Sequence, residues 1–479
     1  MREVITICVG QCGLQVGLDF WTALAKESSV SVDNGTKLDN SAPEPPMPFF
    51  RFDGERTYVP RAILFDLEPG VLSGNKVASS FFNPENVVDG HFFDETLEGE
   101  TKAAGAGNNW AQGYTKAPHV RNKREESVMD IVQREKDLAE DLDGFIVMHS
   151  VAGGTGSGMG SWLIEQLRAS YPKHTIQTVS VLPNESDVVT QPYNTTLALR
   201  RLIEHADATL VIDNQRIQQL AARRHDEGPR DPKEVHKIAN EIITRVMLGW
   251  TSPVRFPSTQ CASLTELVST LVVSPRLNLL APAYAPLNAG RKDNVVTLMK
   301  EFWGPHGHLM PNSQLALPGG ESSSSDRAVS AVTVLQNCRQ TYDEIRMAVR
   351  ASGPSFAPWT VPMWSVITPT LPAMAKRDGK MTAVTLTCST GMAGVLDSVR
   401  KAFDQMWRRP KGGARGEELI TTMDAEELKD IPFMGTYKEA LGDAECLEQF
   451  RDAYLAVQAA AEEYRQAAFN SYMEDLGAM

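Results

Sequence analysis

The chain has 479 residues, of which 42% are hydrophobic and 22% charged, a composition that is typical of a globular protein and excludes a disordered or fibrous one. At roughly 150 residues per domain, the length predicts about three structural units. The net charge of −13 disfavours nucleic acid and membrane surfaces as partners, because both are themselves negatively charged. No apolar stretch approaches the ~18 residues of a membrane span, and the apolar run at residues 4–9 lacks a cleavage site, so we expect a cytosolic chain.

Short β-branched runs alternate with helical stretches over the first 214 residues, a pattern typical of βαβ units around a parallel sheet. The periodicity predicts strands at 4–9, 62–66, 145–150, 175–181 and 208–213, and helices at 13–26, 120–142 and 159–171. Asp231 and Pro232 then open a helix whose apolar residues are spread widely enough to predict burial on more than one side.

The later part of the chain predicts a second unit that mixes helices and strands. Its elements are expected at 264–273, 328–335 and 381–388, with a Gly- and Ser-rich surface loop at 318–326 and long helices at 394–408 and 443–472. We therefore divide the chain into residues 1–230, a central helix at 231–250, an intermediate α+β domain at 251–393 and a C-terminal helical region at 394–479.

The most informative segment, residues 150–160, reads SVAGGTGSGMG and joins a predicted strand to a predicted helix. Glycines at such a junction let backbone N–H groups approach an anion, and the positive end of the helix dipole faces the same point. The segment lacks the lysine of a Walker loop and the spacing of G-x-G-x-x-G. We interpret it as a phosphate loop; the alternative is a close-packed turn without a ligand.

A second glycine turn, GQCG at 10–13, also follows a strand and precedes a helix. Two such turns at the carboxyl ends of parallel strands can face one ligand. Gln11 can reach a phosphate or a metal-bound water, whereas we interpret Cys12 as a small packed residue rather than a nucleophile.

Asp66 and Glu68 follow the next strand, one residue apart, and such carboxylates suit a hydrated Mg²⁺ that neutralises phosphates. Alone they also fit a solvated loop, but the neighbouring glycine turns favour the metal. For a nucleoside, candidate contacts are Asp187, Asn214, Asn240 and His236, although helix caps and a surface histidine are the structural alternatives.

Six segments between residues 10 and 277 stand in the order of the tubulin superfamily, which the chain resembles. They are GQCG at 10–13, DLEP at 66–69, GAGNNWA at 105–111, AGGTGSG at 152–158, QPYN at 191–194 and PRL at 275–277. The match is strong to about residue 287, fainter to 408 and poor over 410–442. Within the superfamily the chain looks most like gamma-tubulin, because of Ala152, Gln191, the NPEN at 83–86 and a C-terminus without a long acidic tail.

The resemblance implies an α/β, tubulin-like fold: an N-terminal Rossmann-like parallel-sheet GTPase domain, a central spine helix, an α+β intermediate domain and C-terminal helices. It also implies GTP or GDP with Mg²⁺ as ligands. By position the phosphates would contact Gln11, Cys12, Ser150, Gly153, Gly154, Thr155 and Gly156, with Glu68 and Asn108 at the phosphate and Mg²⁺ region and Gln11, Asp66 and Glu68 holding the metal largely through water. Asp187 would contact the ribose, Asn214 and Asn240 the guanine, and His236 would stack on the base.

In the family, hydrolysis is completed in trans by a loop that meets the nucleotide of the next subunit. Here that loop is residues 258–266, with Cys261 and Ser263 where the family usually has Asn and Asp. Glu266 aligns with the carboxylate that positions the attacking water, a role that glutamate can fill; the alternative is an exposed helix residue.

The resemblance therefore predicts a GTP-binding cytoskeletal protein that nucleates microtubules as a gamma-tubulin-like template in a ring complex at microtubule-organising centres or spindle poles. Its expected partners are alpha/beta-tubulin dimers, ring-complex proteins and laterally associated copies of itself. The alternatives are a filament-forming tubulin timed by GTP hydrolysis in trans, a structural subunit that holds GTP without turnover, and a nucleotide-dependent dehydrogenase, which the glycine spacing disfavours. Insertions near 88–104, 319–326 and 410–442 are expected to alter partner-facing surfaces without touching the nucleotide pocket.

Overall fold

The computed structural model describes residues 2–473 except 55–56, 69–70, 73–75, 91, 94–104, 184–187, 224–230, 288–293, 304–306, 311–325, 362, 371–379 and 410–415. Asp187 and most of the insertions near 88–104 and 319–326 therefore lie outside the described residues, as does the first part of 410–442.

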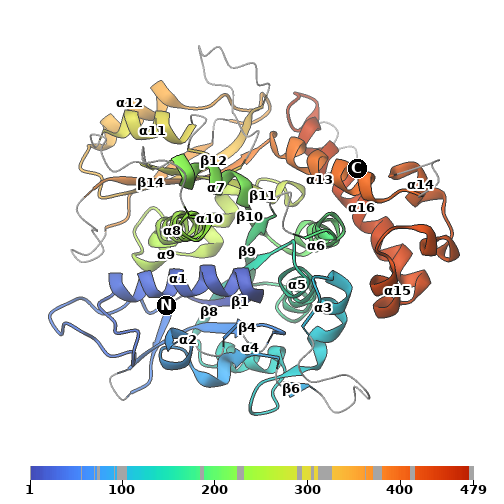
Figure 1. Ribbon diagram of the computed structural model, residues 1–479. Coiled ribbons are helices and arrows are strands. Elements are labelled where there is room, and N and C mark those ends of the chain that lie inside the picture. Colours follow the sequence, from blue (N-terminus) through green and yellow to red (C-terminus); the bar gives the residue numbers. More distant parts are fainter. Residues whose placement is uncertain are drawn as a thin grey trace.

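A ten-stranded sheet runs through the molecule in the order β13-β12-β14-β11-β10-β9-β8-β1-β4-β5 (Figure 1). The strands are β1 (Arg2–Val9), β4 (Ala62–Phe65), β5 (Val87–Val88), β8 (Asp141–Ser150), β9 (Thr175–Leu182), β10 (Ala208–Asp213), β11 (Leu279–Ala285), β12 (Ala328–Gln336), β13 (Trp364–Ile367) and β14 (Thr382–Ser389). From β11 to β5 all neighbours pair in parallel, whereas β14 pairs antiparallel with β11 and β12. The parallel core confirms the predicted α/β fold class. Two small hairpins lie outside it, β2 (Phe50–Phe52) with β3 (Tyr58–Pro60) and β6 (Phe92–Phe93) with β7 (Val120–Arg121).

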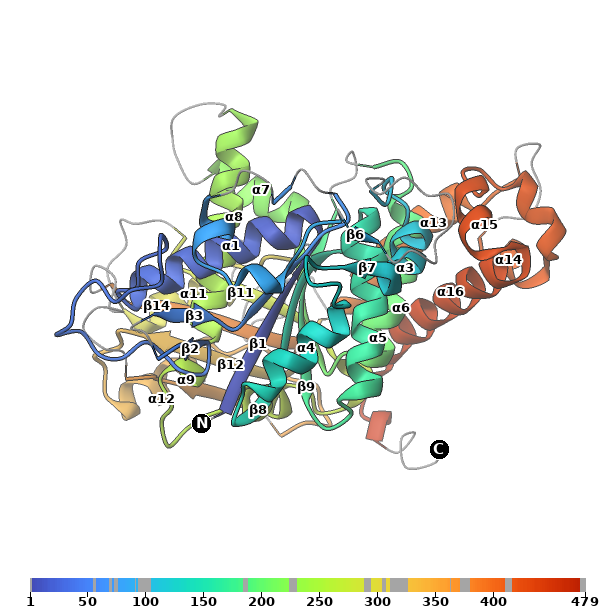
Figure 2. The ribbon, with the colours of Figure 1, turned by 90° about the horizontal axis from the view of Figure 1, so that it is seen from below.

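Helices cover both faces of this sheet (Figures 1 and 2). They are α1 (Gly10–Glu27), α2 (Lys76–Ser80), α3 (Trp110–Lys116), α4 (Val128–Asp137), α5 (Gly160–Ser170), α6 (Gln191–His205), α7 (Asn214–Arg223), α8 (Pro232–Trp250), α9 (Ser252–Arg255), α10 (Leu264–Leu271), α11 (Val295–Trp303), α12 (Tyr342–Ser352), α13 (Met392–Met406), α14 (Glu417–Thr422), α15 (Gly435–Leu441) and α16 (Asp443–Gln466). Helices α1 and α8 lie against one face of the central strands and α4, α5 and α6 against the other, while α13 and α16 pack on the outside of α6. None of the described helices is long and apolar enough to cross a membrane.

The predicted helix at 120–142 is wrong at both ends. Residues Val120 and Arg121 pair in the hairpin with β6, and from Asp141 the chain already belongs to β8. Only Val128–Asp137 is helical, because Ser127 and Asp130 form a capping box that sets its start. The apolar residues Val128, Ile131 and Val132 form the buried side of this shorter helix.

The central helix α8 starts where the sequence predicts. The Asp231 carboxylate accepts the Lys233 N–H at 3.1 Å, and Pro232 occupies the first turn. The helix packs against α1 on one side and against β11 and β14 on another, which accounts for its two-sided apolar pattern. The proposed domain limits stay a prediction, because β10 and β11 pair and the sheet continues across them.

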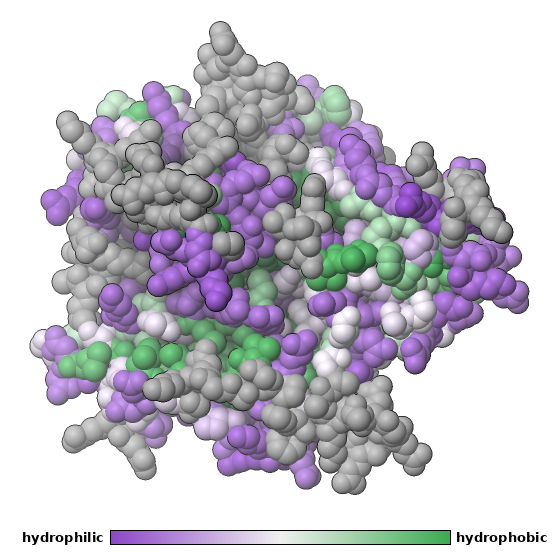
Figure 3. Space-filling model, in the orientation of Figure 1, coloured by the Kyte–Doolittle hydropathy of each residue, from purple (hydrophilic) through white to green (hydrophobic). Residues whose placement is uncertain are grey.

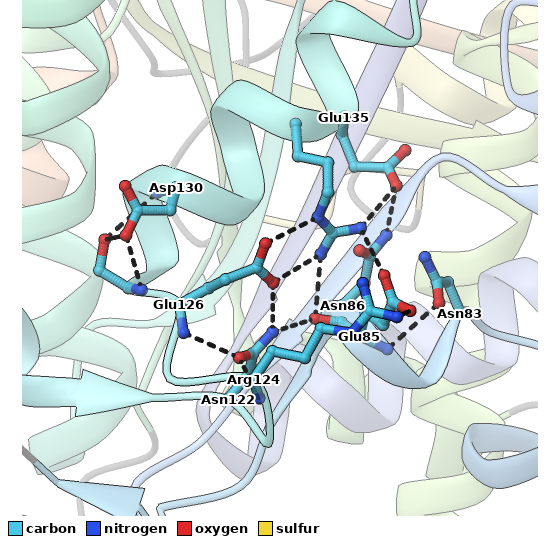
Figure 4. A network of polar contacts seen from close by, with 10 residues as sticks. Asn83, Glu85, Asn86, Asn122, Arg124, Glu126, Asp130 and Glu135 are labelled. Atoms are coloured by element: carbon cyan, nitrogen blue, oxygen red, sulfur yellow. Dashed lines mark hydrogen bonds and ion pairs between the residues drawn. The ribbon is translucent and has the colours of Figure 1, made fainter.

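A polar network joins α4 to the short helix η1 (Pro84–Asn86), as Figure 4 shows. Asn86 is buried and its amide donates to the Ala62 carbonyl at 3.0 Å and to Glu135 Oε1 at 2.8 Å. Arg134 bridges the carboxylates of Glu85 and Glu126 beside it. Asn86 thus links α4 to β4 near the edge of the sheet, whereas Asn83 caps η1 by accepting the Glu85 N–H.

Candidate functional site

A cavity of about 150 Å³ opens at the carboxyl ends of β1, β4 and β8. It is lined by Val9, Gly10, Gln11, Cys12, Asp66, Glu68, Ala106, Asn108, Ser150, Gly153, Gly154, Thr155 and Gly156. This set includes every residue that the sequence analysis placed at the phosphates and the metal. The structure therefore brings together, from four separate loops, one half of the predicted site.

The glycines of these loops permit close packing between backbones. Gly10 adopts a φ of +72°, and a Cβ there would lie 2.7 Å from the Gly156 nitrogen. A Cβ on Gly154 would lie 2.5 Å from the Ala106 Cβ and 2.7 Å from the Asn109 nitrogen. The turn after β8 is therefore close-packed, as the structural alternative predicted, and the same packing presents its backbone to the cavity.

The chain after β8 runs through a π-helical turn, η3 (Thr155–Met159), before α5 begins. Such turns are rare and recur at functional sites. His149, at the end of β8, supports the turn from below: its Nδ1 donates to the Gly156 carbonyl at 2.9 Å, so its Nε2 accepts the Ser180 hydroxyl at 2.8 Å. Burial lowers the pKa of His149 to about 4, so the ring is neutral near pH 7 and keeps this arrangement. The sequence analysis assigned His149 no role, because a single histidine in an apolar strand carries no signal of its own.

Cys12 lies half-buried at the start of α1, and burial raises the pKa of its thiol to about 11. The thiol therefore stays protonated near pH 7, which agrees with its interpretation as a packed residue rather than a nucleophile.

Asp66 and Glu68 supply oxygen donors at the edge of the cavity. Asp66 Oδ1 accepts the Glu68 N–H at 3.1 Å, and its buried Oδ2 has no hydrogen-bond partner among the described residues. Burial, reinforced by the nearby Glu68 charge, raises the pKa of Asp66 to about 6. A buried carboxylate oxygen without a partner fits a site for Mg²⁺, which prefers oxygen ligands and keeps several waters. No cluster of three or more His, Cys, Asp or Glu side chains able to hold a metal occurs in the described part of the chain.

The loop at 105–109 closes the cavity through its backbone. Gly107 and Asn108 both adopt positive φ, +55° and +54°. The Asn108 carbonyl accepts the Thr190 hydroxyl at 2.9 Å and the amide of Asn194 at 2.8 Å. Asn194 belongs to the QPYN segment, to which the sequence analysis gave no role; a buried asparagine that follows a proline near a helix start is the signal that could have identified it.

None of the described residues of the 410–442 region lines the cavity, so the expectation that this region does not touch the nucleotide pocket is not contradicted, although α15 contacts residues directly beside the cavity. Helix α15 packs against α3, directly after the loop at 105–109. The Thr436 hydroxyl accepts the amide of Asn109 at 2.7 Å, and the Tyr437 hydroxyl donates to Asn194 Oδ1 at 2.5 Å. Tyr437 is the buried residue of α15, and α15 packs on α3 beside the loop at 105–109.

The residues predicted for the nucleoside are not among those that line the cavity. Asp187 lies outside the described residues, and Asn214 begins α7. His236 is exposed on α8. Figure 3 shows a hydrophilic surface near the centre of this face, in the area where Figure 1 places α7 and α8. Asn240 is half-buried and its side chain forms a hydrogen bond with Asp19 of α1. Contacts of these residues with a base or a sugar stay a prediction.

Glu266 lies at the other end of the sheet, by the amino end of β1. The buried Ser263 caps α10 by accepting the Glu266 N–H at 3.1 Å, and it also accepts a hydrogen bond from Arg2 at 2.9 Å. Glu266 Oε2 accepts the Ala262 N–H at 2.7 Å, and Oε1 lies 3.9 Å from the Arg2 guanidinium. Glu266 borders a groove of about 480 Å³ between α10, α12 and β13. The whole of β1 separates Glu266 from the cavity, so its carboxylate cannot reach a ligand bound in the cavity of the same chain. A role of Glu266 in trans stays a prediction.

Residues 3–222 match the model of the Tubulin/FtsZ family, GTPase domain. The matched segment, just under half of the chain, extends from β1 into α7 and contains all four loops of the cavity. A GTPase domain of this family accounts for the glycine-lined cavity and implies a guanine nucleotide as a ligand of the chain. Residues 3–222 therefore form a tubulin-like GTPase domain, a type of domain that implies binding of GTP or GDP.

Proposed function

We propose that this chain is a GTP-binding cytoskeletal protein that nucleates microtubules in the manner of gamma-tubulin. In this proposal it acts as a template in a ring complex at microtubule-organising centres or spindle poles. Alpha/beta-tubulin dimers stack on it, copies of the chain associate laterally, and ring-complex proteins hold the array together. The match to a GTPase domain supports the proposal that the chain binds a guanine nucleotide. The gamma-like residues Ala152 and Gln191 support the proposal that it acts as a template.

The observation that carries the template role is the state of the loop at 258–266. Cys261 is buried and burial raises the pKa of its thiol to about 11, so it offers no charge to a neighbouring nucleotide. The Ser263 hydroxyl is buried and already bonded to Arg2 and to the start of α10. The loop thus offers one carboxylate, that of Glu266, and it too has partners within its own chain. Slow turnover in trans is what a template that keeps its nucleotide requires.

Within one subunit, the residues of the cavity would bind and orient the nucleotide. The backbone N–H groups of the turns after β1 and β8 can donate to phosphate oxygens, and the start of each helix adds a favourable dipole. Asp66 and Glu68 would hold Mg²⁺ through water, and the metal, when bound, neutralises phosphate charge. Neutral His149 keeps the second turn in place beneath the phosphates.

A filament-forming tubulin that hydrolyses GTP in trans is the second candidate, and one observation favours it. The Glu266 side chain is about half exposed, at 51%, and its contact with Arg2 is a long one. A docking subunit could therefore draw the carboxylate away from α10 and toward a phosphate-bound water, the role that a glutamate fills in such chemistry.

The experiment measures nucleotide content and turnover together. The purified chain is denatured, the released nucleotide is identified by chromatography, and GTP hydrolysis is followed against protein concentration with wild type and Glu266→Ala. Bound guanine nucleotide, turnover that stays negligible as concentration rises, and shortened lag of alpha/beta-tubulin assembly support the template. Turnover that climbs with concentration and is lost in Glu266→Ala supports the filament, and absence of any guanine nucleotide overturns both.

A further inference from the structure

The side-chain amide of Asn194 forms hydrogen bonds with three separate parts of the chain: the loop at 105–109, the turn after β8 and α15. Asn194 lies in the first turn of α6 and is completely buried. Its Nδ2 donates to the carbonyls of Asn108 at 2.8 Å and Ala152 at 2.7 Å, so one side chain holds the loop at 105–109 and the turn after β8. Both loops line the cavity. The two backbones cannot separate without breaking one of these bonds.

The oxygen of the same amide is used just as fully. Oδ1 accepts the Trp110 backbone N–H at 2.9 Å and the Tyr437 hydroxyl at 2.5 Å. Because the Trp110 N–H and the two carbonyls each have a single role as donor or acceptor, only one orientation of the amide satisfies all of them. Tyr437 is buried on α15, in the C-terminal part of the chain, so α15 contacts the very group that sets the spacing of the two pocket loops.

Two further contacts place the same region against the pocket loops. Asn109 caps α3 by accepting the Gln112 N–H at 3.2 Å, while its amide donates to the Thr436 hydroxyl of α15. The Tyr193 hydroxyl donates to the Pro432 carbonyl at 3.3 Å, just before α15. The docking of α15 is therefore specified by polar contacts to Asn109, at the end of the loop at 105–109, and to the start of α6.

We infer that Asn194 is a positioning residue that couples the pocket to α15, so that bound nucleotide and the docked state of α15 stabilise each other. The inference rests on the proposed function in one respect, that a guanine nucleotide occupies the cavity. Nucleotide that orders the two loops fixes the Asn194 amide for Tyr437, and α15 in its docked state fixes the amide for the loops. Such coupling is reciprocal by thermodynamic necessity, so it can be measured from either side.

The first test removes one oxygen atom. Tyr437→Phe keeps the ring packing and deletes the hydroxyl that reaches Asn194. We expect release of a fluorescent GDP, measured by stopped flow on the full chain, to be about fivefold to tenfold faster, the effect of one hydrogen bond.

The matched control is Tyr464→Phe. It deletes a buried hydroxyl that is bonded to the Leu279 backbone in the same C-terminal region and has no contact with the pocket loops. We expect it to lower the melting temperature but leave release within twofold of wild type. Equal release from Tyr437→Phe and wild type, or equal acceleration by both variants, overturns the inference.

The second test separates the two sides of the amide. Asn194→Asp keeps the acceptor for Tyr437 and removes both donors to the loops. We expect release of the fluorescent GDP to be at least tenfold faster. We also expect GDP to slow hydrogen exchange in Gly435–Leu441 of the wild-type chain but not of this variant. If this variant releases GDP at the wild-type rate, or if GDP still slows its hydrogen exchange in α15, the coupling is overturned. If Asn194→Asp does not fold, the result for Tyr437→Phe decides. Wild-type chain that binds no GDP overturns the proposed function itself, whereas GDP binding with indifferent variants overturns only the coupling.

Discussion

The two ends of β1 carry two differently built regions. At the carboxyl end, Val9 and Gly10 border a cavity whose walls are backbone, glycine and buried carboxylate. At the amino end, the half-exposed side chain of Arg2 contacts the buried hydroxyl of Ser263 and the half-exposed carboxylate of Glu266, so these groups satisfy one another within the chain. The first region is arranged for a ligand before any ligand arrives, whereas the second must open its contacts before it can act on a neighbour. Under the proposed function, nucleotide binding therefore needs one subunit, whereas hydrolysis in trans would need a second subunit to reorder α10.

The largest effect should come from the packed backbone of the cavity. In Gly154→Ala the added Cβ meets Ala106 and Asn109 below 3 Å, so the loops at 105–109 and 153–156 must move apart. We expect a loss of about 2 kcal/mol in the free energy of unfolding and about a 100-fold loss of GDP affinity, because phosphate contacts tolerate little displacement.

The matched control for that variant is Gly394→Ala. Gly394 lies within α13, and a Cβ there would meet no atom within 4 Å. We expect a gain of about 0.5 to 1 kcal/mol from helix propensity and unchanged GDP affinity, measured by calorimetry and thermal unfolding. Equal GDP affinity in both variants would show that the close packing around Gly154 does not shape the site.

Asp66 should have the next largest effect, and its sign depends on the metal. Its folded pKa, about 6, lies above the unfolded value, so the ionised carboxylate destabilises the metal-free fold. That cost is full above pH 6 and disappears as the pH falls toward 4. Asp66→Asn should therefore raise the free energy of unfolding of metal-free protein by about 2 kcal/mol at pH 7 and by almost nothing at pH 4.

The same substitution should weaken Mg²⁺-dependent GTP binding, because it removes a negative oxygen donor. Denaturant titrations at pH 4 and 7, with and without Mg²⁺, measure both effects. If the difference in unfolding free energy between the variant and wild type is the same at pH 4 and pH 7, the pKa of Asp66 is not raised. If GTP binding by the variant depends on Mg²⁺ as in wild type, Asp66 does not hold the metal.

Much of the first region could be predicted from the sequence, for a physical reason. Glycine turns after β-branched runs have few other uses, so residues 10–13 and 150–160 indicated the carboxyl ends of two parallel strands and the side of the sheet on which a ligand lies. The strands at 4–9 and 208–213 were predicted to within two residues, because fully buried parallel strands are continuous apolar runs.

Other parts carried no local signal. Helix α6 was missed because buried polar residues, among them Asn194 and Arg201, interrupt its apolar pattern. Strand β11 contains Pro282, which argues against a central strand on local rules, yet the strand is held by neighbours on both sides. The packing of α15 beside the pocket loops depends on contacts such as that between Asn194 and Tyr437, which are more than 240 positions apart. Such long-range contacts leave no periodic pattern in the sequence.

In the second region, Ser263 should have an effect of about 1 kcal/mol. Ser263→Ala removes the cap of α10 and the acceptor for Arg2, and we expect that loss in the free energy of unfolding. Ser263→Asp keeps a cap of similar strength, restores the residue type usual in the family, and should raise concentration-dependent GTP turnover above wild type. Turnover of Ser263→Asp at the wild-type level would show that the missing carboxylate is not what limits hydrolysis.

The smallest effect should come from Arg2, and it is the most direct test of what restrains Glu266. Both side chains are about half exposed and 3.9 Å apart, so Arg2→Ala should change the free energy of unfolding by about 0.5 kcal/mol or less. In the same variant Glu266 keeps its contacts with the Ala262 N–H and the Cys261 side chain but loses the cation beside it, so it is freer to turn outward. If the chain is a template, GTP turnover in Arg2→Ala stays at the wild-type level at every protein concentration. A rise in turnover that Glu266→Gln abolishes in the double variant would instead mean that Glu266 is a catalytic group held back by Arg2, and that the amino end of β1 is half of a composite active site.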